Sequence, residues 1–123
     1  MKLQTAPNDS KNTITGHGPG WVAINGRRFD RSLLLTPDRI DADWGPAAGE
    51  ALAELHLSGL AALTGTVVLL GTGARQRFPA PALLRPLFEA GIGVEVMATS
   101  AACRTYNILV AEGRDVAAAL IVE

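Results

Sequence analysis

The stretch "IGVEVMATSAACRTYNILVAEGRDVAAALIV", residues 92–122, contains the pattern that decides the fold. Its start alternates apolar residues with Gly93 and Glu95, and its end is the apolar run "VAAALIV"; both features are typical of strands. Between them, small residues open a helix that we expect over residues 100–112, closed by Gly113. A strand, a helix and a strand at this spacing predict a right-handed crossover between parallel strands.

The preceding segments extend this alternation towards the N-terminus. "TVVLLG", residues 66–71, is a short continuous apolar run, which is typical of a strand buried on both faces. "PAPALLRPLFEAG", residues 79–91, predicts a helix that is kinked or split at Pro86. "AAGEALAELHLSGLAAL", residues 47–63, predicts a helix that reaches at least His56. The second half of the chain therefore has a βαβαβ order.

The first half of the chain has an antiparallel pattern. Two apolar runs, residues 21–24 and 32–35, lie on either side of Asn25-Gly26, a dipeptide that favours a two-residue hairpin turn. The front half then makes the sheet mixed. We expect a flexible lead-in over residues 1–12 and a single three-layer α/β domain over residues 13–123, with a mixed central sheet.

Composition excludes several classes of protein. The chain has 123 residues, 48% hydrophobic and 19% charged, as one globular domain requires. A net charge of −1 gives no general attraction to nucleic acid, so no nucleic-acid partner is expected. The single cysteine and the two histidines show no metal-ligand spacing, and we predict neither a metal nor a cofactor. No apolar run approaches the ~20 residues of a membrane span, and the N-terminus lacks a signal-peptide core. We therefore expect a cytoplasmic protein without direct membrane insertion.

The loops that follow the parallel strands define a candidate cleft. Ligands of α/β proteins bind at the carboxyl ends of the strands, where two of these loops should meet. Backbone N–H groups of a Gly-Thr-Gly loop can hold an anion, and Arg75 and Arg77, which share a face if this segment is extended, could clamp it. The candidate cleft comprises Gly71, Thr72, Gly73, Arg75, Thr99, Ser100 and Arg104. The alternative is that Gly-Thr-Gly is only a tight turn out of a buried strand.

Cys103, Tyr106 and Asn107 allow two interpretations. If Thr99 or Ser100 caps the helix, the helix dipole and Arg104 would favour a Cys103 thiolate, the condition for a reactive cysteine. Helical spacing instead directs Cys103, Tyr106 and Asn107 towards the sheet, where they would pack and hydrogen-bond. Neither histidine belongs to a motif that would supply a base for the thiol, so no catalytic residue is assigned.

The motifs "ACRTYNIL", residues 102–109, and "EGR", residues 112–114, carry a family resemblance that spans residues 14–122. The chain resembles the small proteins grouped with the adipogenesis-associated protein and a mitochondrial respiratory complex I assembly factor. Many bacterial members are known only as a domain of unknown function. The resemblance implies a three-layer α/β fold with a mixed sheet, no enzymatic activity established for the family as a whole, and action through protein partners. Ala98 departs from the family, since many members have a polar residue there, often Asp.

Two functional hypotheses follow. The first is a non-catalytic binding or assembly protein, linked to respiratory-complex biogenesis, with a protein partner. The alternative is a small-molecule or anion-binding protein, or an enzyme, that uses the cleft at the strand ends. The absent base, metal ligands and phosphate-loop motif favour the first, and the oligomeric state is left open.

Overall fold

The computed structural model describes residues 11–46 and 51–123. The predicted lead-in of residues 1–12 lies outside the described residues except for Lys11 and Asn12. Both are held in place: the Lys11 ammonium lies 3.0 Å from a carboxylate oxygen of Asp38, and the Asn12 N–H donates to the Pro37 carbonyl at 2.8 Å. Residues 11 and 12 are therefore anchored to the segment around Pro37.

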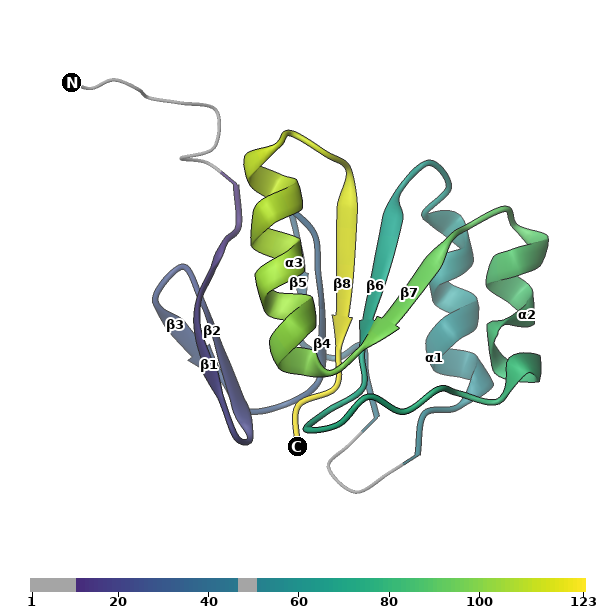
Figure 1. The fold of residues 1–123 in the computed structure, drawn as a ribbon, viewed down its shortest axis with the longest axis horizontal. Coiled ribbons are helices and arrows are strands. Elements are labelled where there is room, and N and C mark those ends of the chain that lie inside the picture. Colours follow the sequence, from purple (N-terminus) through teal and green to yellow (C-terminus); the bar gives the residue numbers. More distant parts are fainter. Residues whose placement is uncertain (1–10, 47–50) are drawn as a thin grey trace.

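The strands form two sheets (Figure 1). The smaller is antiparallel, in the order β1-β2-β3: β1 (Ile14–Gly18), β2 (Trp21–Ile24) and β3 (Arg27–Phe29). The larger has the order β5-β4-β8-β6-β7: β4 (Leu33–Leu35), β5 (Ile40–Asp41), β6 (Val67–Gly71), β7 (Val94–Met97) and β8 (Val116–Leu120). The helices are α1 (Glu54–Ser58), the 3-10 helix η2 (Gly59–Ala62), α2 (Pro81–Glu89) and α3 (Thr99–Ala111).

The larger sheet is mixed. β6 runs parallel to its neighbours β7 and β8, whereas β4 is antiparallel to both β5 and β8. α2 connects β6 to β7, and α3 connects β7 back to β8 on the far side of β6. The predicted α/β class, with a parallel second half in a mixed sheet, is confirmed.

The front strands differ from the prediction, because they do not all join one sheet. Asn25 and Gly26 have φ of 53° and 83° and form the expected two-residue turn. Such a turn pairs the residues directly beside it, so Ile24 faces Arg27 and the partner of β2 is β3. The apolar run Leu33–Leu35 instead forms β4 and pairs with β8, which lies far along the chain.

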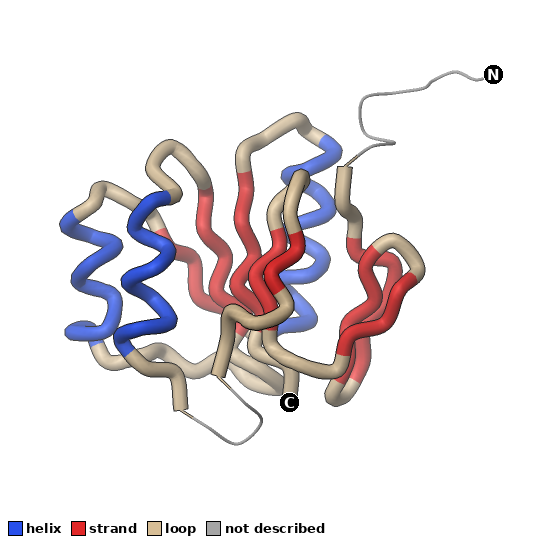
Figure 2. The backbone as a smooth tube through the Cα atoms, turned by 180° about the vertical axis from the view of Figure 1, so that it is seen from behind, coloured by secondary structure: helices blue, strands red, loops and turns tan. Residues whose placement is uncertain are grey.

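The large sheet is covered on both faces (Figures 1 and 2). Along β6 the side chains alternate, with Leu69 in the core cluster beneath α3 and Val68 and Leu70 in the cluster beneath α1 and α2. The small sheet shares the α3 side, where Val22 and Ile24 join the same cluster as Leu69. The domain thus has a central sheet between two layers.

The helices agree with expectation in part. α2 is continuous through Pro86, so of the two predicted outcomes the split is excluded. α1 extends past His56 as predicted but begins only at Glu54; part of the predicted helix, residues 47–50, lies outside the described residues. α3 ends as predicted, with Gly113 at a φ of 76°. No helix of the described residues is long and apolar enough to cross a membrane.

Candidate functional site

The two predicted loops meet at the carboxyl edge of the parallel strands. The Gly73 N–H donates to the Thr99 hydroxyl at 2.8 Å, and the Thr99 N–H donates to the Gly73 carbonyl at 2.9 Å. The Thr99 hydroxyl in turn donates to the Ile121 carbonyl at 2.7 Å, just beyond β8. Because three neighbouring parallel strands end here, one threonine side chain joins all three chain segments.

Gly71 and Thr72 lie behind this junction. A Cβ placed on Gly71 would lie 3.0 Å from the Thr99 Cα, so the glycine allows α3 to approach β6 closely. The buried Thr72 hydroxyl accepts from the Arg77 N–H at 2.9 Å and donates to the Arg75 carbonyl at 2.6 Å. The Thr72 hydroxyl is therefore engaged within the loop and is not free to bind a ligand.

A cavity of about 290 Å³ opens at this edge, between the β1–β2 turn and the start of α3. Its lining includes the predicted Gly73, Thr99 and Ser100, together with His17 and Trp21, which the sequence did not indicate. The glycine-rich "GHGPGW", residues 16–21, is the signal that could have pointed to it, because glycines beside an aromatic ring leave space near the backbone.

The predicted anion clamp is not assembled in this cavity. Arg75 and Arg77, the predicted clamp, are exposed and do not line it, and the same holds for Arg104. The carboxylate of Glu123 does, and it lies against Gly73 and pairs with Arg77 at 3.1 Å. The Gly73 N–H, which was expected to bind an anion, is already hydrogen-bonded to Thr99. An anion in this cavity would therefore lack that donor and would lie near the negative charge of Glu123.

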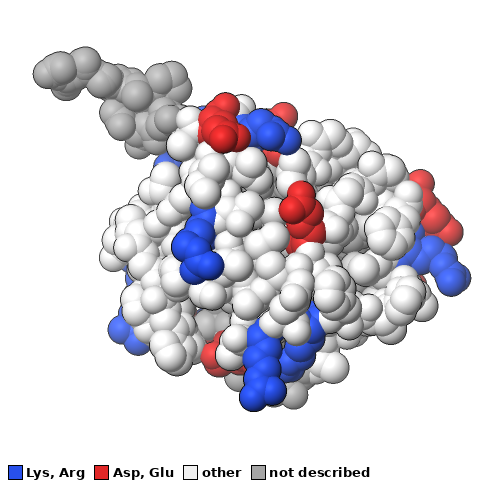
Figure 3. Space-filling view, viewed as in Figure 1, with Lys and Arg blue, Asp and Glu red and all other residues white. Residues whose placement is uncertain are grey.

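The charge distribution agrees with this description. Figure 3 shows basic side chains gathered at the lower edge of the face seen in Figure 1, where the loop between β6 and α2 lies. Arg75 and Arg77 of this loop are exposed. They therefore lie at the surface of the loop, and Arg77 pairs with the cavity-lining Glu123.

Neither Thr99 nor Ser100 caps α3. The N-cap is Ala98, which has no side chain that could accept a hydrogen bond. The Thr99 hydroxyl is committed to Gly73 and Ile121 instead. The helix start thus joins neighbouring strands and lacks the cap that a reactive thiolate at Cys103 was expected to share.

Cys103 is buried, with 1% of its surface exposed. Burial raises the pKa of the Cys103 thiol to about 11, and the neighbouring Arg104 charge offsets only part of that rise. The thiolate is therefore scarce at neutral pH. The geometry supports the interpretation of Cys103 as a packing residue.

Tyr106 and Asn107 fasten the small sheet to α3. The Tyr106 hydroxyl donates to the Asn12 carbonyl at 2.9 Å. The Asn107 side chain accepts from the Ile14 N–H at 2.9 Å and donates to the Ile14 carbonyl at 2.7 Å, as a neighbouring strand would. Burial, with the Asp38 charge in second place, raises the pKa of Tyr106 and keeps its hydroxyl protonated as a donor.

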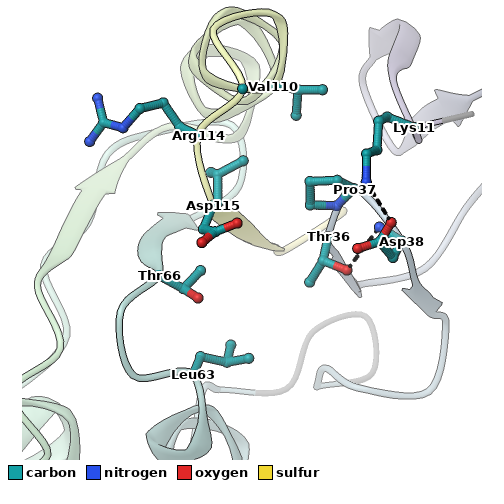
Figure 4. A pocket seen from close by; sticks show the side chains of 11 residues that line it. Lys11, Thr36, Pro37, Asp38, Leu63, Thr66, Val110, Arg114 and Asp115 are labelled. Atoms are coloured by element: carbon teal, nitrogen blue, oxygen red, sulfur yellow. Dashed lines mark hydrogen bonds and ion pairs between the residues drawn. The ribbon is translucent and has the colours of Figure 1, made fainter. Parts of the chain in front are cut away.

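A second cavity, of about 220 Å³, lies at the opposite edge of the sheet, where β6 and β8 begin (Figure 4). Its walls come from four segments of the chain: Lys11 before β1, the turn between β4 and β5, the segment before β6, and the end of α3 with its link to β8. The motif "EGR", residues 112–114, belongs to that link.

Local sequence builds each wall. The Arg114 N–H donates to the Leu109 carbonyl and the Gly113 N–H to the Val110 carbonyl, each at 2.9 Å, which is the Schellman pattern of helix termination. This turn places Asp115 directly before β8, with its side chain facing the cavity (Figure 4).

On the opposite wall, Pro37 favours a turn, and the Thr36 hydroxyl accepts from the N–H groups of Asp38 and Arg39 at 3.3 and 3.0 Å. The Asn12 side-chain amide also donates to the Thr36 carbonyl at 3.0 Å. Both walls are fixed by hydrogen bonds, so the cavity is preformed.

No group of three or more His, Cys, Asp and Glu side chains within residues 11–46 and 51–123 is arranged to hold a metal ion. The cavity in Figure 4 fits this finding, since its acidic side chains are Asp38 and Asp115 and the first is already paired with Lys11. A hard divalent cation prefers more oxygen ligands than these.

This arrangement defines a class of small α/β domain. A crystal structure of a Bordetella parapertussis protein shares it with a TM-score of 0.79 and 41% sequence identity, over 93% of this chain and 98% of that one. The model of the family described as "Protein of unknown function (DUF498/DUF598)" matches residues 14–121. The chain belongs to this family.

Two curated relatives carry descriptive names. The bovine "NADH dehydrogenase [ubiquinone] 1 alpha subcomplex assembly factor 3" is 35% identical over 110 residues, which cover 88% of this chain and 59% of the relative. The "13 kDa major membrane protein" of Francisella tularensis is 35% identical over 72 residues, 58% of each chain. The matched part thus spans less than two thirds of either relative.

Proposed function

We propose that this protein is a non-catalytic assembly protein that acts by binding protein partners, in a process related to the biogenesis of NADH dehydrogenase. The alignment with the bovine assembly factor carries the proposal. It covers 88% of this chain, so the part that the two proteins share is nearly the entire domain. Because the same alignment covers 59% of the relative, the proposal concerns what this domain contributes to such a factor.

The polar side chains of the motif "ACRTYNIL" are engaged inside the protein, which supports a binding role. The side chains of Tyr106 and Asn107 form hydrogen bonds with the backbone of residues 12–14. Cys103 is buried with a raised pKa, which makes it a poor nucleophile. The residues that looked most suited to chemistry therefore stabilise the scaffold.

Deleting the gene in the organism that encodes the chain tests the proposal. We expect less fully assembled NADH dehydrogenase on native gels and slower NADH oxidation by membranes, with both restored by the wild-type gene. Unchanged amounts of assembled enzyme would contradict the link to NADH dehydrogenase.

A partner search tests the binding role separately. The chain, tagged and expressed at its native level, is crosslinked in cells and purified. We expect a specific protein, enriched over a tagged control of equal size, among the crosslinked species. If no protein is enriched under these conditions, the assembly role is wrong.

A further inference from the structure

The cavity at the start of β6 and β8 is lined by a carboxylate, that of Asp115, which forms no hydrogen bond or ion pair within the described residues. We propose that it receives an arginine side chain from a protein partner, with Asp115 as the carboxylate that binds the guanidinium. The inference rests on the proposed function for the existence of a partner and specifies the contact that the partner makes.

Asp115 is the acidic group available for this contact. Within the described residues its carboxylate takes part in no hydrogen bond or ion pair, and Figure 4 shows it directed into the cavity. Asp38 faces it from the opposite wall, with one carboxylate oxygen held by Lys11 at 3.0 Å. Arg114 belongs to the rim, and its guanidinium points away from the cavity (Figure 4). The groups that face inward therefore carry a net negative charge.

The volume of the cavity favours a side chain over a cofactor. Pockets for drug-sized ligands measure about 300–1,000 Å³. This cavity has about 220 Å³. It therefore has room for one extended side chain entering from a bound surface.

Apolar residues occupy the rest of the wall. Leu63, Val110 and Pro37 line the same cavity as the two carboxylates (Figure 4). Arginine places its methylene stem against apolar surface while its head reaches polar partners. The cavity therefore offers apolar surface to the stem of such a side chain and carboxylates to its head.

Arginine fits better than lysine because carboxylates face the cavity from two walls. A guanidinium has five N–H donors in a plane and can donate to several acceptors at once, whereas an ammonium is a compact point charge. The Thr66 hydroxyl at the floor adds a further acceptor (Figure 4).

A binding experiment with a small probe tests this inference without any partner. The isotope-labelled full chain is titrated with N-acetyl-arginine amide and followed by amide chemical shifts. We expect saturable shifts at Thr66, Asp38 and Asp115, with affinity on the order of millimolar for a single side chain. The neutral analogue N-acetyl-citrulline amide should leave these amides unshifted.

Variants locate the interaction. Asp115→Asn keeps the shape of the side chain and should weaken arginine binding about tenfold, the effect of a lost charge-assisted hydrogen bond. Asp43→Asn, at an exposed aspartate outside the cavity, is the matched control and should bind as the wild type does. Equal binding by Asp115→Asn, equal shifts with citrulline, or no shifts at these amides would each overturn the proposal.

The partner experiment separates this inference from the proposed function. If the probe binds through Asp115 but crosslinking yields no partner, the pocket stands and the assembly role fails. If a partner is captured equally by wild type and Asp115→Asn, the assembly role stands and the pocket assignment fails. A homodimer of the chain that Asp115→Asn dissociates would also overturn the assignment, because the occupant would then be a second copy.

Discussion

Asn107 shows how one side chain can take the place of a strand. Its amide oxygen and nitrogen bind the N–H and carbonyl of Ile14, the two groups with which a neighbouring strand would pair. Tyr106 adds a third bond to the same segment at Asn12. The small sheet is thus attached to α3 by backbone-directed bonds as well as by apolar packing.

Replacing Asn107 with Asp removes the donor and places a carboxylate against the Ile14 carbonyl. Leaving a polar group unpaired costs about 1–3 kcal/mol, and more when a charge is involved, so we expect the free energy of unfolding to fall by about 3 kcal/mol. Urea unfolding measures the change. Ile108→Ala, on the exposed side of the same helix, is the control and should change stability by less than about 0.5 kcal/mol. Equal effects from both substitutions would contradict the role of Asn107.

The raised pKa of Cys103 makes the free energy of unfolding depend on pH in the alkaline range. Its pKa rises from 9.0 in an exposed thiol to about 11 in the folded protein. The unfolded chain therefore releases the thiol proton first, so the stability is complete below about pH 9 and decreases as the pH rises towards 11. Unfolding at a series of alkaline pH values measures this decrease. Cys103→Ala should flatten it, and an unchanged slope would show that other groups are responsible.

The sequence predicted the fate of these residues through helical spacing. Cys103 and Asn107 lie four positions apart and share a face, whereas Arg104 falls on another, and the structure buries Cys103 and exposes Arg104. What spacing could not predict was the partner of Asn107, because Ile14 lies 93 positions away.

At the scale of elements, α3 approaches β6 closely at Gly71. A Cβ there would lie 3.0 Å from the Thr99 Cα and 3.2 Å from the Ala102 Cβ. The contact lets the small residues that begin α3 lie directly on the sheet.

Gly71→Ala should push α3 away from the sheet. Overpacking of this kind costs about 1–3 kcal/mol, and thermal or urea unfolding measures it. Gly93→Ala is the matched control, since a Cβ there meets no atom within 4 Å and its φ needs no glycine. A Gly71→Ala variant as stable as Gly93→Ala would show that the helix adapts without cost.

Elements with a local signal could be predicted, and elements paired over long distances could not. The apolar runs of β6, β7 and β8 and the terminating Gly113 identify the parallel half directly. β4 has the same apolar character, but its partner is β8, where Leu33 faces Leu120. No local pattern distinguishes that pairing from a hairpin with β2.

The candidate sites follow the same division. The carboxyl-edge junction was predictable because strand ends in a parallel sheet converge, and Gly73 and Thr99 do meet there. The cavity in Figure 4 was missed because its walls at Thr36, Leu63 and Asp115 come from three distant segments. Each wall alone looks like an ordinary turn or helix end.

At the scale of the whole molecule, the central sheet contributes side chains to the core on both of its faces. Its strands send alternate side chains to the cluster beneath α3 and to the cluster beneath α1 and α2. Because the same strands pack against both layers, unfolding of one layer would remove packing from the sheet on which the other layer depends. We therefore expect the domain to unfold as one unit.

The two tryptophans report on the two layers. Trp21 lies in β2 of the small sheet, and Trp44 packs in the other layer, where its indole N–H donates to the His56 carbonyl at 2.9 Å. Trp44→Phe and Trp21→Phe each leave a single fluorophore. Urea unfolding of the two variants, followed by fluorescence, should agree with their circular dichroism transitions. A fluorescence midpoint well below the circular dichroism midpoint in either variant would show that its layer unfolds first.

The attachment of β1 to α3 also fixes the order of events when the chain is made. The bonds between Ile14 and Asn107 close a loop of 93 positions. Closing such a loop costs conformational entropy before the contacts that it allows can form. During synthesis, the small sheet emerges before α3 and cannot dock on it until α3 has left the ribosome. Its apolar side chains Val22 and Ile24 therefore stay uncovered while residues 30–111 are made, which makes this sheet a segment that a chaperone can bind during that interval.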